Sequence, residues 1–324
     1  MNVGVIGVGN MGKHHARNYS ELAGVNLIAV ADLDTKCGQE IAAKFKCKHY
    51  SDYQEMLKKE KLDLVTIAVP SKLHKKVALD CINAGLHILI EKPIALNVKD
   101  AKEIVARAKQ KNIKFTVGHI ERFNPSVLKL KEMIEKGKLG EITSISTYRI
   151  GPMPEQIRDA NVVVDIGVHD IDLMNWFYGK MPTEIRAGGG NALNKGRQDY
   201  VDIFLKYGNK TGVAKANWIT PIKVRKMTVS GTKAYAELNF ITQELSVYES
   251  NVSMNYDDFG EFVIKFGEPK DQKIIAVDNV EPLKAQIKSF IKAIKENGRP
   301  AVTAREAIDA LDIACRVDKL IRKP

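Results

Sequence analysis

The first 120 residues alternate between short runs of apolar residues and longer stretches with a helical pattern. Continuous apolar runs are typical of strands that are buried on both faces of a parallel sheet. The runs that we predict as strands cover residues 2–9, 26–32, 63–70, 87–92 and 114–119. The segments that we predict as helices lie near 11–22, 72–84 and 97–111. This alternation predicts an α/β domain with a parallel, doubly wound sheet.

The pattern changes in the second half of the chain. After a predicted helix near 126–136, residues 183–264 consist mainly of strand-like runs, separated by turn sequences such as YGNKTG and SGTKA. Short strands joined by such turns predict an antiparallel sheet. Two helical patterns near 281–297 and 303–321 close the chain. We therefore expect an α+β domain with a mainly antiparallel sheet.

A chain of 324 residues is long for one core, which agrees with two domains. We expect the first domain over residues 1–121 and the second over 122–324, and the last helix could pack back on the first domain. Hydrophobic residues make up 44% of the chain and charged residues 27%, as in a globular protein. No apolar run approaches the roughly 20 residues that span a bilayer. The N-terminus enters a strand without the basic and apolar regions of a signal peptide, so we expect a cytoplasmic protein.

The charge pattern and the cysteines bear on which ligands, metals and disulfide bonds this chain is expected to have. The formal net charge is +11, but lysines and acids are interleaved along the whole chain. This pattern does not favour nucleic-acid binding, whereas it is compatible with an anionic small substrate or simply with a lysine-rich surface. The four cysteines lie apart, without a CxxC pair or a histidine cluster, so we expect unlinked thiols and no metal site. The cysteines are Cys37, Cys47, Cys81 and Cys315.

The segment GVIGVGNMG contains Gly7, Gly9 and Gly12 in the GxGxxG spacing, between a predicted strand and a predicted helix. In this context the glycines allow a tight turn, a close approach of the backbone to a pyrophosphate, and close packing of the helix. The N–H groups at the start of the helix, with Asn10 and Met11 in the turn, would face the phosphates.

Asp32 ends the second predicted strand, at the distance from the glycines where a dinucleotide-binding domain carries an acidic residue. Its carboxylate would accept hydrogen bonds from the ribose hydroxyls and would repel a 2′-phosphate. The sequence therefore predicts a Rossmann domain that binds NAD rather than NADP. Asp34 is a weaker candidate for the same role.

Two further clusters carry candidate chemistry. Glu91, Lys92 and Pro93 follow a strand at the carboxyl edge of the predicted sheet, where α/β domains bind ligands. Asp165 and His169 are four residues apart and would share one face of a helix. One histidine with neighbouring acids is a poor metal site, so we expect the acids to orient the imidazole.

Four segments in this order, GVIGVGNMG with Asp32, AVPSKLH, EKP and DIGVHDID, resemble the Gfo/Idh/MocA oxidoreductases, which act on sugars and cyclitols. Within that family, GHIERFNP (118–125) and YRIGPMPEQIRD (148–159) look most like the UDP-N-acetylglucosamine 3-dehydrogenases. The resemblance implies NAD as cofactor, a small sugar or nucleotide-sugar substrate, and a second domain that binds substrate. It also implies an open-faced sheet there, used for homodimer or homotetramer contacts.

The resemblance also implies roles for individual residues. Lys92 would be the catalytic lysine, joined around the substrate by Asp165 and His169 from the second domain. The cofactor-binding residues that it implies beyond the glycine turn are Pro70, Ser71, His74, Glu91, Lys92, Pro93 and Asn124. The Lys92–Pro93 bond would be cis, and Arg122 would lie near the nicotinamide and the substrate. Arg149 and Arg158 are hypotheses for contacts with a substrate diphosphate, with surface salt bridges as the alternative.

We therefore expect NAD-dependent oxidation of a secondary hydroxyl, at carbon 3 of UDP-N-acetylglucosamine. The hypothesis gives His169 the role of general base and Lys92 that of stabilising the developing alkoxide, and the reverse assignment stays open. Three alternatives also stay open. The first is an inositol or free-sugar dehydrogenase of the same family, the second is a glycoside hydrolase that recycles bound NAD, and the third is a non-catalytic NAD sensor.

Overall fold

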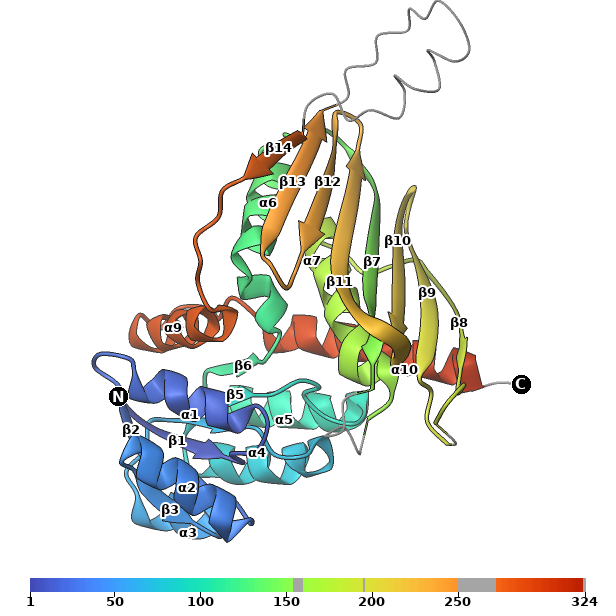
Figure 1. Cartoon of the computed structure of the whole chain (residues 1–324). Coiled ribbons are helices and arrows are strands. Elements are labelled where there is room, and N and C mark those ends of the chain that lie inside the picture. Colours follow the sequence, from blue (N-terminus) through green and yellow to red (C-terminus); the bar gives the residue numbers. More distant parts are fainter. Residues whose placement is uncertain (154–159, 195, 250–271, 323–324) are drawn as a thin grey trace, which may run out of the picture. The chain divides into compact units, whose positions relative to one another are not determined.

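A computed structural model describes residues 1–153, 160–194, 196–249 and 272–322 (Figure 1). The chain divides into two compact units. The first comprises Met1–Ile120, Pro154–Asp172 and Glu281–Asp318, and the second comprises Glu121–Met153, Leu173–Val280 and Lys319–Pro324. The predicted second domain, residues 122–324, contains two segments that belong to the first unit in the structure. The functions assigned to the two domains stay predictions.

The first unit contains a six-stranded parallel sheet with the order β3-β2-β1-β4-β5-β6. The strands are β1 Asn2–Ile6, β2 Asn26–Ala31, β3 Lys48–Tyr50, β4 Leu64–Ile67, β5 His87–Ile90 and β6 Phe115–Val117. This is the strand order of a dinucleotide-binding Rossmann domain, which confirms the predicted α/β class. The sequence analysis did not predict β3, because its three residues, Lys-His-Tyr, form no apolar run.

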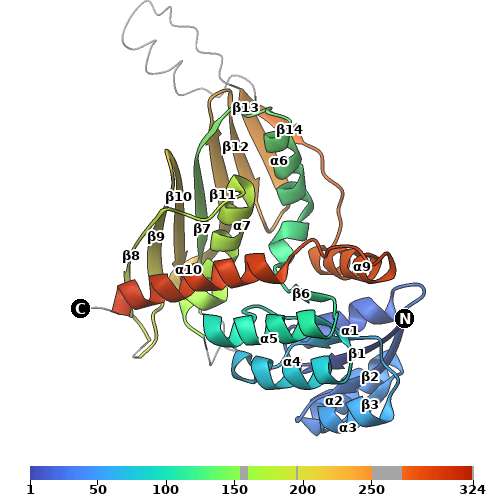
Figure 2. The ribbon, with the colours of Figure 1, turned by 180° about the vertical axis from the view of Figure 1, so that it is seen from behind.

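Helices cover both faces of this sheet. The helices of this unit are α1 Gly12–Ser20, α2 Thr35–Phe45, α3 Tyr53–Lys59, α4 His74–Asn83, α5 Val98–Gln110, α9 Pro282–Lys295 and most of α10 Ala304–Arg322. The side chains of Asp34, Asp52 and Asn97 cap the N-termini of α2, α3 and α5. Helices α4 and α5 lie side by side (Figure 2).

The segment from Glu281 returns to the first unit through specific contacts. Ile287 and Phe290 of α9 join the core cluster that includes Val3 and Tyr19. The amide of Gln286 donates to the carbonyl of Val117, 3.0 Å away, at the end of β6. The last segments of the chain therefore help to bury the sheet that the first segments build.

The second unit contains an eight-stranded sheet with the order β14-β13-β12-β11-β7-β10-β9-β8. The strands are β7 Ile142–Pro152, β8 Glu184–Gly190, β9 Tyr200–Tyr207, β10 Lys210–Asn217, β11 Ile219–Gly231, β12 Ala234–Asn239, β13 Glu244–Glu249 and β14 Gln272–Ile275. Of the neighbouring pairs, β7 and β10 run parallel and the others antiparallel. The expected mainly antiparallel α+β domain is confirmed.

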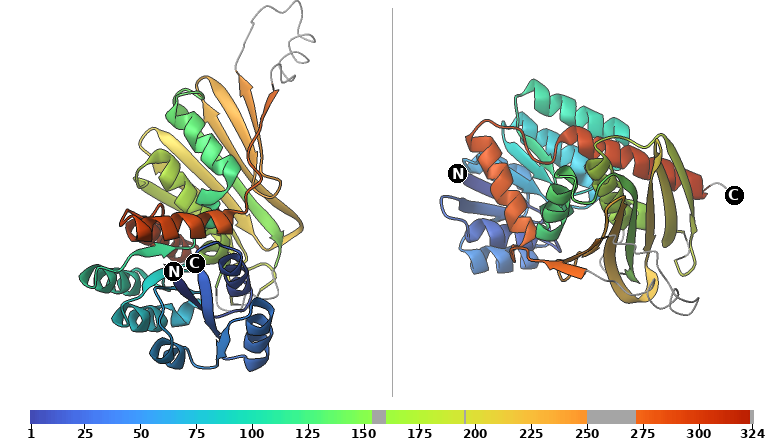
Figure 3. Two further views of the ribbon diagram at one scale, coloured as in Figure 1. Left: turned by 90° about the vertical axis from the view of Figure 1, so that its left-hand side faces the viewer. Right: turned by 90° about the horizontal axis from the view of Figure 1, so that it is seen from above.

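One face of this sheet is buried and the other is open. A row of inward side chains crosses six strands at aligned positions, and it consists of Ile203, Ala214, Thr147, Met227, Leu238 and Leu245. Helix α6 Pro125–Glu135 and the end of α7 Val168–Tyr178 lie on one face (Figure 3). The Tyr178 hydroxyl donates to the carbonyl of Thr211 in β10. Over the described residues, the helices include none with the length and apolar character needed to cross a bilayer.

Candidate functional site

The glycine turn between β1 and α1 has the geometry of a phosphate-binding turn. Gly7 has a φ of +83°, and a Cβ on it would lie 2.7 Å from the Ala68 oxygen. A Cβ on Gly12 would lie 1.8 Å from the Gly7 oxygen, so only glycine lets α1 start this close to the turn. A Cβ on Gly9 would meet nothing within 4 Å. The open position over Gly9, at the start of α1, leaves room for a phosphate.

Asp32 links the end of β2 to this turn. Its Oδ2 accepts a hydrogen bond from the Val8 amide at 2.7 Å, and its Oδ1 accepts one from the Asp34 amide at 2.9 Å. These bonds hold the carboxylate in place. Asp34 has a different function, because its side chain accepts the Cys37 amide and caps α2.

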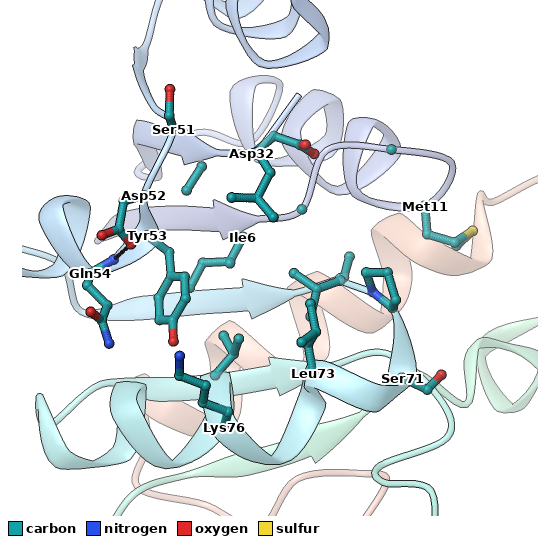
Figure 4. Close-up of a pocket in the computed structure, with 18 of the residues that line it drawn as sticks. Ile6, Met11, Asp32, Ser51, Asp52, Tyr53, Gln54, Ser71, Leu73 and Lys76 are labelled. Atoms are coloured by element: carbon teal, nitrogen blue, oxygen red, sulfur yellow. Dashed lines mark hydrogen bonds between the residues drawn. The ribbon is translucent and has the colours of Figure 1, made fainter. Parts of the chain in front are cut away.

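The turn and Asp32 line a cavity of about 630 Å³ (Figure 4). The predicted cofactor residues on its wall are Gly7, Gly9, Asn10, Met11, Asp32, Pro70 and Ser71. The wall also includes Ser51, Asp52, Tyr53, Gln54 and Lys76, which sequence reasoning missed. The signal for the first four was weak, because they follow the short strand β3. This cavity has the features of a dinucleotide-binding site, which are an open glycine turn, the N-terminus of a helix and a carboxylate held in place.

His74 does not line this cavity. It is buried, and its Nδ1 and Nε2 lie 2.8 and 2.9 Å from the carbonyl oxygens of Pro93 and Val69. The imidazole therefore joins the turn after β4 to the residue that follows Lys92. The peptide bond between Lys92 and Pro93 is cis.

Lys92 and Asp165 are in direct contact within the first unit. The Lys92 Nζ donates to the Asp165 Oδ1 at 2.9 Å and to the Asp165 carbonyl oxygen at 2.7 Å. The two side chains are only 17% and 16% exposed, so water screens the pair much less than a surface ion pair. The structure thus brings together two residues that are far apart in the sequence.

The helix that carries Asp165 is not regular. Residues Val163–Gly167 form a π-helical turn before α7 begins at Val168. Asn161 holds the start of this turn, since its side-chain oxygen accepts the amides of Val163 and Val164 at 3.1 Å each. The expected single α-helical face is therefore wrong in detail, because Asp165 lies in the π turn and His169 in the first turn of α7. Such turns are frequent at functional sites.

His169 has a buried histidine neighbour that the sequence analysis missed. Its ring centroid lies 6.5 Å from that of His119, edge to face. The His119 Nδ1 lies 3.6 Å from the Asp172 Oδ2, and both of these side chains are buried. Within the described residues, no three His, Cys, Asp or Glu side chains converge in the manner of a metal site. Of the acids near His169, Asp165 pairs with Lys92 and Asp172 lies next to His119.

Glu91 also lies away from the cavity wall. It is buried, and its Oε1 is 2.8 Å from the His15 Nε2. Burial raises the pKa of Glu91, but the hydrogen bond and charge of His15, together with the charge of Lys92, outweigh burial and lower it overall. His15 of α1 is thus the partner of a carboxylate next to Lys92.

Three of the remaining predicted residues, Arg122, Asn124 and Arg149, belong to the second unit. Asn124 caps α6 and donates to the Phe240 carbonyl, so its side chain has a structural function there. Arg149 is buried, donates to Glu121 at 2.8 Å, and stacks on the Phe240 ring at 4.3 Å. Arg122 lies over the Trp176 ring at 5.5 Å. Arg158 falls outside the described residues, and all four substrate or cofactor roles stay predictions.

Two family models match this chain. The model for an oxidoreductase family with an NAD-binding Rossmann fold matches residues 1–119. The model for the GFO/IDH/MocA C-terminal domain matches residues 127–237. The first unit therefore contains an NAD-binding Rossmann domain, and the cofactor is NAD.

Individual relatives are similar over most of the chain. UDP-N-acetylglucosamine 3-dehydrogenase of Acidithiobacillus ferrooxidans is 29% identical over 250 residues, which are 76% of this chain and 77% of that protein. Inositol 2-dehydrogenase 2 of Saccharopolyspora erythraea is 30% identical over 218 residues, 66% of this chain and 64% of that protein. A solved structure of the Acidithiobacillus enzyme superimposes with a TM-score of 0.86 at 24% identity, covering 99% of this chain and 97% of that one. This last likeness shows a shared fold.

Proposed function

This chain belongs to the Gfo/Idh/MocA family of oxidoreductases, and from that premise we propose that it is an NAD-dependent dehydrogenase of a sugar hydroxyl. The substrate that we propose is UDP-N-acetylglucosamine, oxidised at carbon 3 to the 3-keto nucleotide sugar. The observation that carries the proposal is the hydrogen-bonded pair of Lys92 and Asp165. Asp165 precedes His169 by four residues. The relative that is 29% identical and bears that enzyme's name supports the choice of substrate.

Oxidation of a secondary alcohol requires removal of a hydride and of a proton. NAD accepts the hydride when it is bound, and the protein must orient the hydroxyl and take its proton. An ammonium has three N–H donors, and Asp165 accepts two from Lys92. The third can donate to the substrate oxygen and stabilise the alkoxide as it forms.

In this scheme His169 takes the proton as a neutral imidazole. A carboxylate 2.9 Å from the Lys92 Nζ attracts an ammonium, which suits a stabilising cation better than a proton acceptor. Single-turnover hydride transfer by His169→Ala and Lys92→Ala over a range of pH tests the assignment. A full rate for His169→Ala at neutral pH would show that His169 is not the base.

The substrate is tested by incubating the protein with NAD and a panel of UDP-sugars, inositols and hexoses while following the absorbance of NADH. NADH formation with UDP-N-acetylglucosamine, and not with its free sugar, supports the proposal. NADH formation with inositol alone would favour the second candidate, which the inositol dehydrogenase relative supports. Product formation without net NADH would indicate a hydrolase that recycles its cofactor.

Three further expectations form part of this proposal. The second domain binds the sugar and forms a homodimer or homotetramer through the open face of its sheet, and the enzyme works in the cytoplasm. Arg158 binds the substrate diphosphate. Equal UDP affinities of the unmodified protein and Arg158→Ala would remove Arg158 from the substrate site.

A further inference from the structure

The buried pair of His15 and Glu91 is not used by the proposed reaction. His15 lies on α1, three residues after Gly12, and its side chain is 0% exposed. Its Nε2 is 2.8 Å from the Glu91 Oε1. Neither side chain lines the dinucleotide cavity. A buried charge is costly unless it is paired, so the pair needs an explanation.

The Glu91 carboxylate is held from three elements. His15 contacts it from α1. The amide of Lys92 donates to its Oε2 at 3.3 Å, directly after β5. Gly118, which follows β6, packs closely against the carboxylate, because a Cβ on Gly118 would lie 2.8 Å from the same Oε2. Gly118 carries no charged group. The carboxylate thus lies between the helix that begins at the glycine turn and the backbone of the proposed catalytic lysine.

We infer that His15 is a positioning residue that acts through Glu91 on the backbone of Lys92, so that the Lys92 ammonium meets Asp165. The inference rests on the proposed function, because it assumes that Lys92 acts in catalysis. It also gives the first turn of α1 a second function. One face of this turn borders the phosphate site, and His15 connects it to the lysine.

The charges around Glu91 set the expected pH behaviour. Burial by itself raises the pKa of Glu91, and His15, followed by Lys92, lowers it below its ordinary value. Glu91 is therefore ionised at neutral pH in the unmodified protein. Without His15 the burial effect dominates, its pKa rises, and the carboxyl group is neutral until the pH is higher. A neutral Glu91 holds the Lys92 amide less strongly.

The first experiment measures kcat from pH 6 to 9 for three variants. His15→Leu should lose about tenfold in kcat at pH 6 for each unit by which the pKa of Glu91 rises above 6, and kcat should recover as the pH rises. Its KM for NAD should stay within about threefold, because the cavity wall is unchanged. His15→Gln keeps an N–H donor for Glu91 and should restore most of the rate. His14→Leu, an exposed neighbour on the same helix, is the matched control and should behave like the unmodified protein.

The second experiment needs no substrate. Thermal unfolding of the cofactor-free protein is followed from pH 4 to 8. In the unmodified protein the pKa of Glu91 is lower in the folded state than in the unfolded chain, where it is about 4.3. This difference stabilises the folded protein above pH 4.3, and the stabilisation is lost as the pH falls. His15→Leu instead loses stability as the pH rises, so the difference between the two melting temperatures should widen with pH.

These measurements separate the inference from the proposed function. If the unmodified protein oxidises no sugar, the proposed function fails, and the unfolding series still tests the pair. A kcat for His15→Leu that is unchanged, or is lowered equally at every pH, overturns the inference. So does a melting difference that is constant with pH. If His15→Leu does not fold, Gly118→Ala is the alternative variant, because its methyl group would displace the Glu91 carboxylate without changing any charge. An unchanged kcat for Gly118→Ala would then overturn the inference.

Discussion

Two oxygens of one residue, Asp165, accept hydrogen bonds from the Lys92 Nζ. One is a carboxylate oxygen, which supplies charge. The other is a backbone carbonyl, which fixes direction regardless of the protonation state of the side chain. The position of the ammonium therefore depends on the backbone of the π turn as well as on the ion pair.

The proposed role of Lys92 predicts that its loss impairs catalysis rather than cofactor binding. Lys92→Ala should lower kcat by about 10²–10³-fold, the effect of removing a donor that stabilises an oxyanion, and should leave NAD affinity within about threefold. Steady-state kinetics and NAD titration by fluorescence measure both. Lys75→Ala is the control, because Lys75 is a half-exposed lysine of α4 paired with Asp100. A weak effect of Lys92→Ala on kcat would contradict the assignment.

Asp32 should decide between the two dinucleotides. In Asp32→Ala, the loss of the carboxylate removes acceptors for the ribose hydroxyls and the repulsion of a 2′-phosphate. We expect kcat/KM with NAD to fall on the order of tenfold or more, with a relative gain for NADP. The matched variant Asp34→Ala removes the cap of α2, so it should cost about 1 kcal/mol of stability without changing the cofactor ratio. A changed ratio in Asp34→Ala instead would reverse the assignment.

Among the elements, the glycine turn and α1 act as one unit, and the second and third glycines of the turn, Gly9 and Gly12, differ in their surroundings. The structure leaves open space above Gly9 but packs Gly12 against the Gly7 carbonyl. We therefore expect the bound cofactor to require Gly9 and the fold to require Gly12.

This difference predicts opposite results for the same substitution. Gly12→Ala should lower the free energy of unfolding by about 3 kcal/mol or more, because backbone must move away from the new methyl group. Gly9→Ala should change it by less than about 0.5 kcal/mol, yet weaken NAD binding at least about tenfold. Urea unfolding and NAD titration distinguish the two. Normal NAD binding by a folded Gly9→Ala protein would contradict the proposed position of the phosphates.

The elements also show what local sequence can predict. Apolar runs identified five strands of the first sheet, and the glycine spacing identified the cavity, because both signals lie within a few neighbouring residues. The contact between His15 and Glu91 and that between His119 and Asp172 join distant segments, so nothing in their own surroundings indicated them. The π turn was missed because its apolar spacing is also compatible with a regular helix.

At the scale of the whole molecule, neither compact unit is one continuous stretch of the chain, because each combines three separate segments. Asp165 and His169 belong to the same compact unit as the glycine turn and Lys92, although the strands of the second sheet follow them in the sequence. Sequence periodicity assigns elements but does not show which unit a later segment joins. The first unit thus contains both the cavity and the Lys92–Asp165 pair.

The second unit presents a face that a single chain leaves open. Opposite the buried row, Val213 and Tyr148 are 39% and 44% exposed, and Val213 lies level with Phe204 and Ser146 on its neighbouring strands. Exposed apolar and aromatic side chains on a broad sheet are typical of a surface that a second copy covers. The proposal of a homo-oligomer therefore predicts where the copies meet.

A charge in the middle of this face should separate the copies. The unmodified protein should have a mass of at least twice 36.1 kDa by light scattering after size exclusion, and Val213→Lys should reduce it by half or more. The reason is that an unpaired ammonium buried between two sheets is costly. Leu128→Lys is the control, because Leu128 is an exposed apolar residue of α6 rather than of the sheet, and it should leave the mass unchanged. An unmodified protein of 36.1 kDa would rule out the oligomer, and an oligomer that persists in Val213→Lys but dissociates in Leu128→Lys would move the contact from the sheet to the helix.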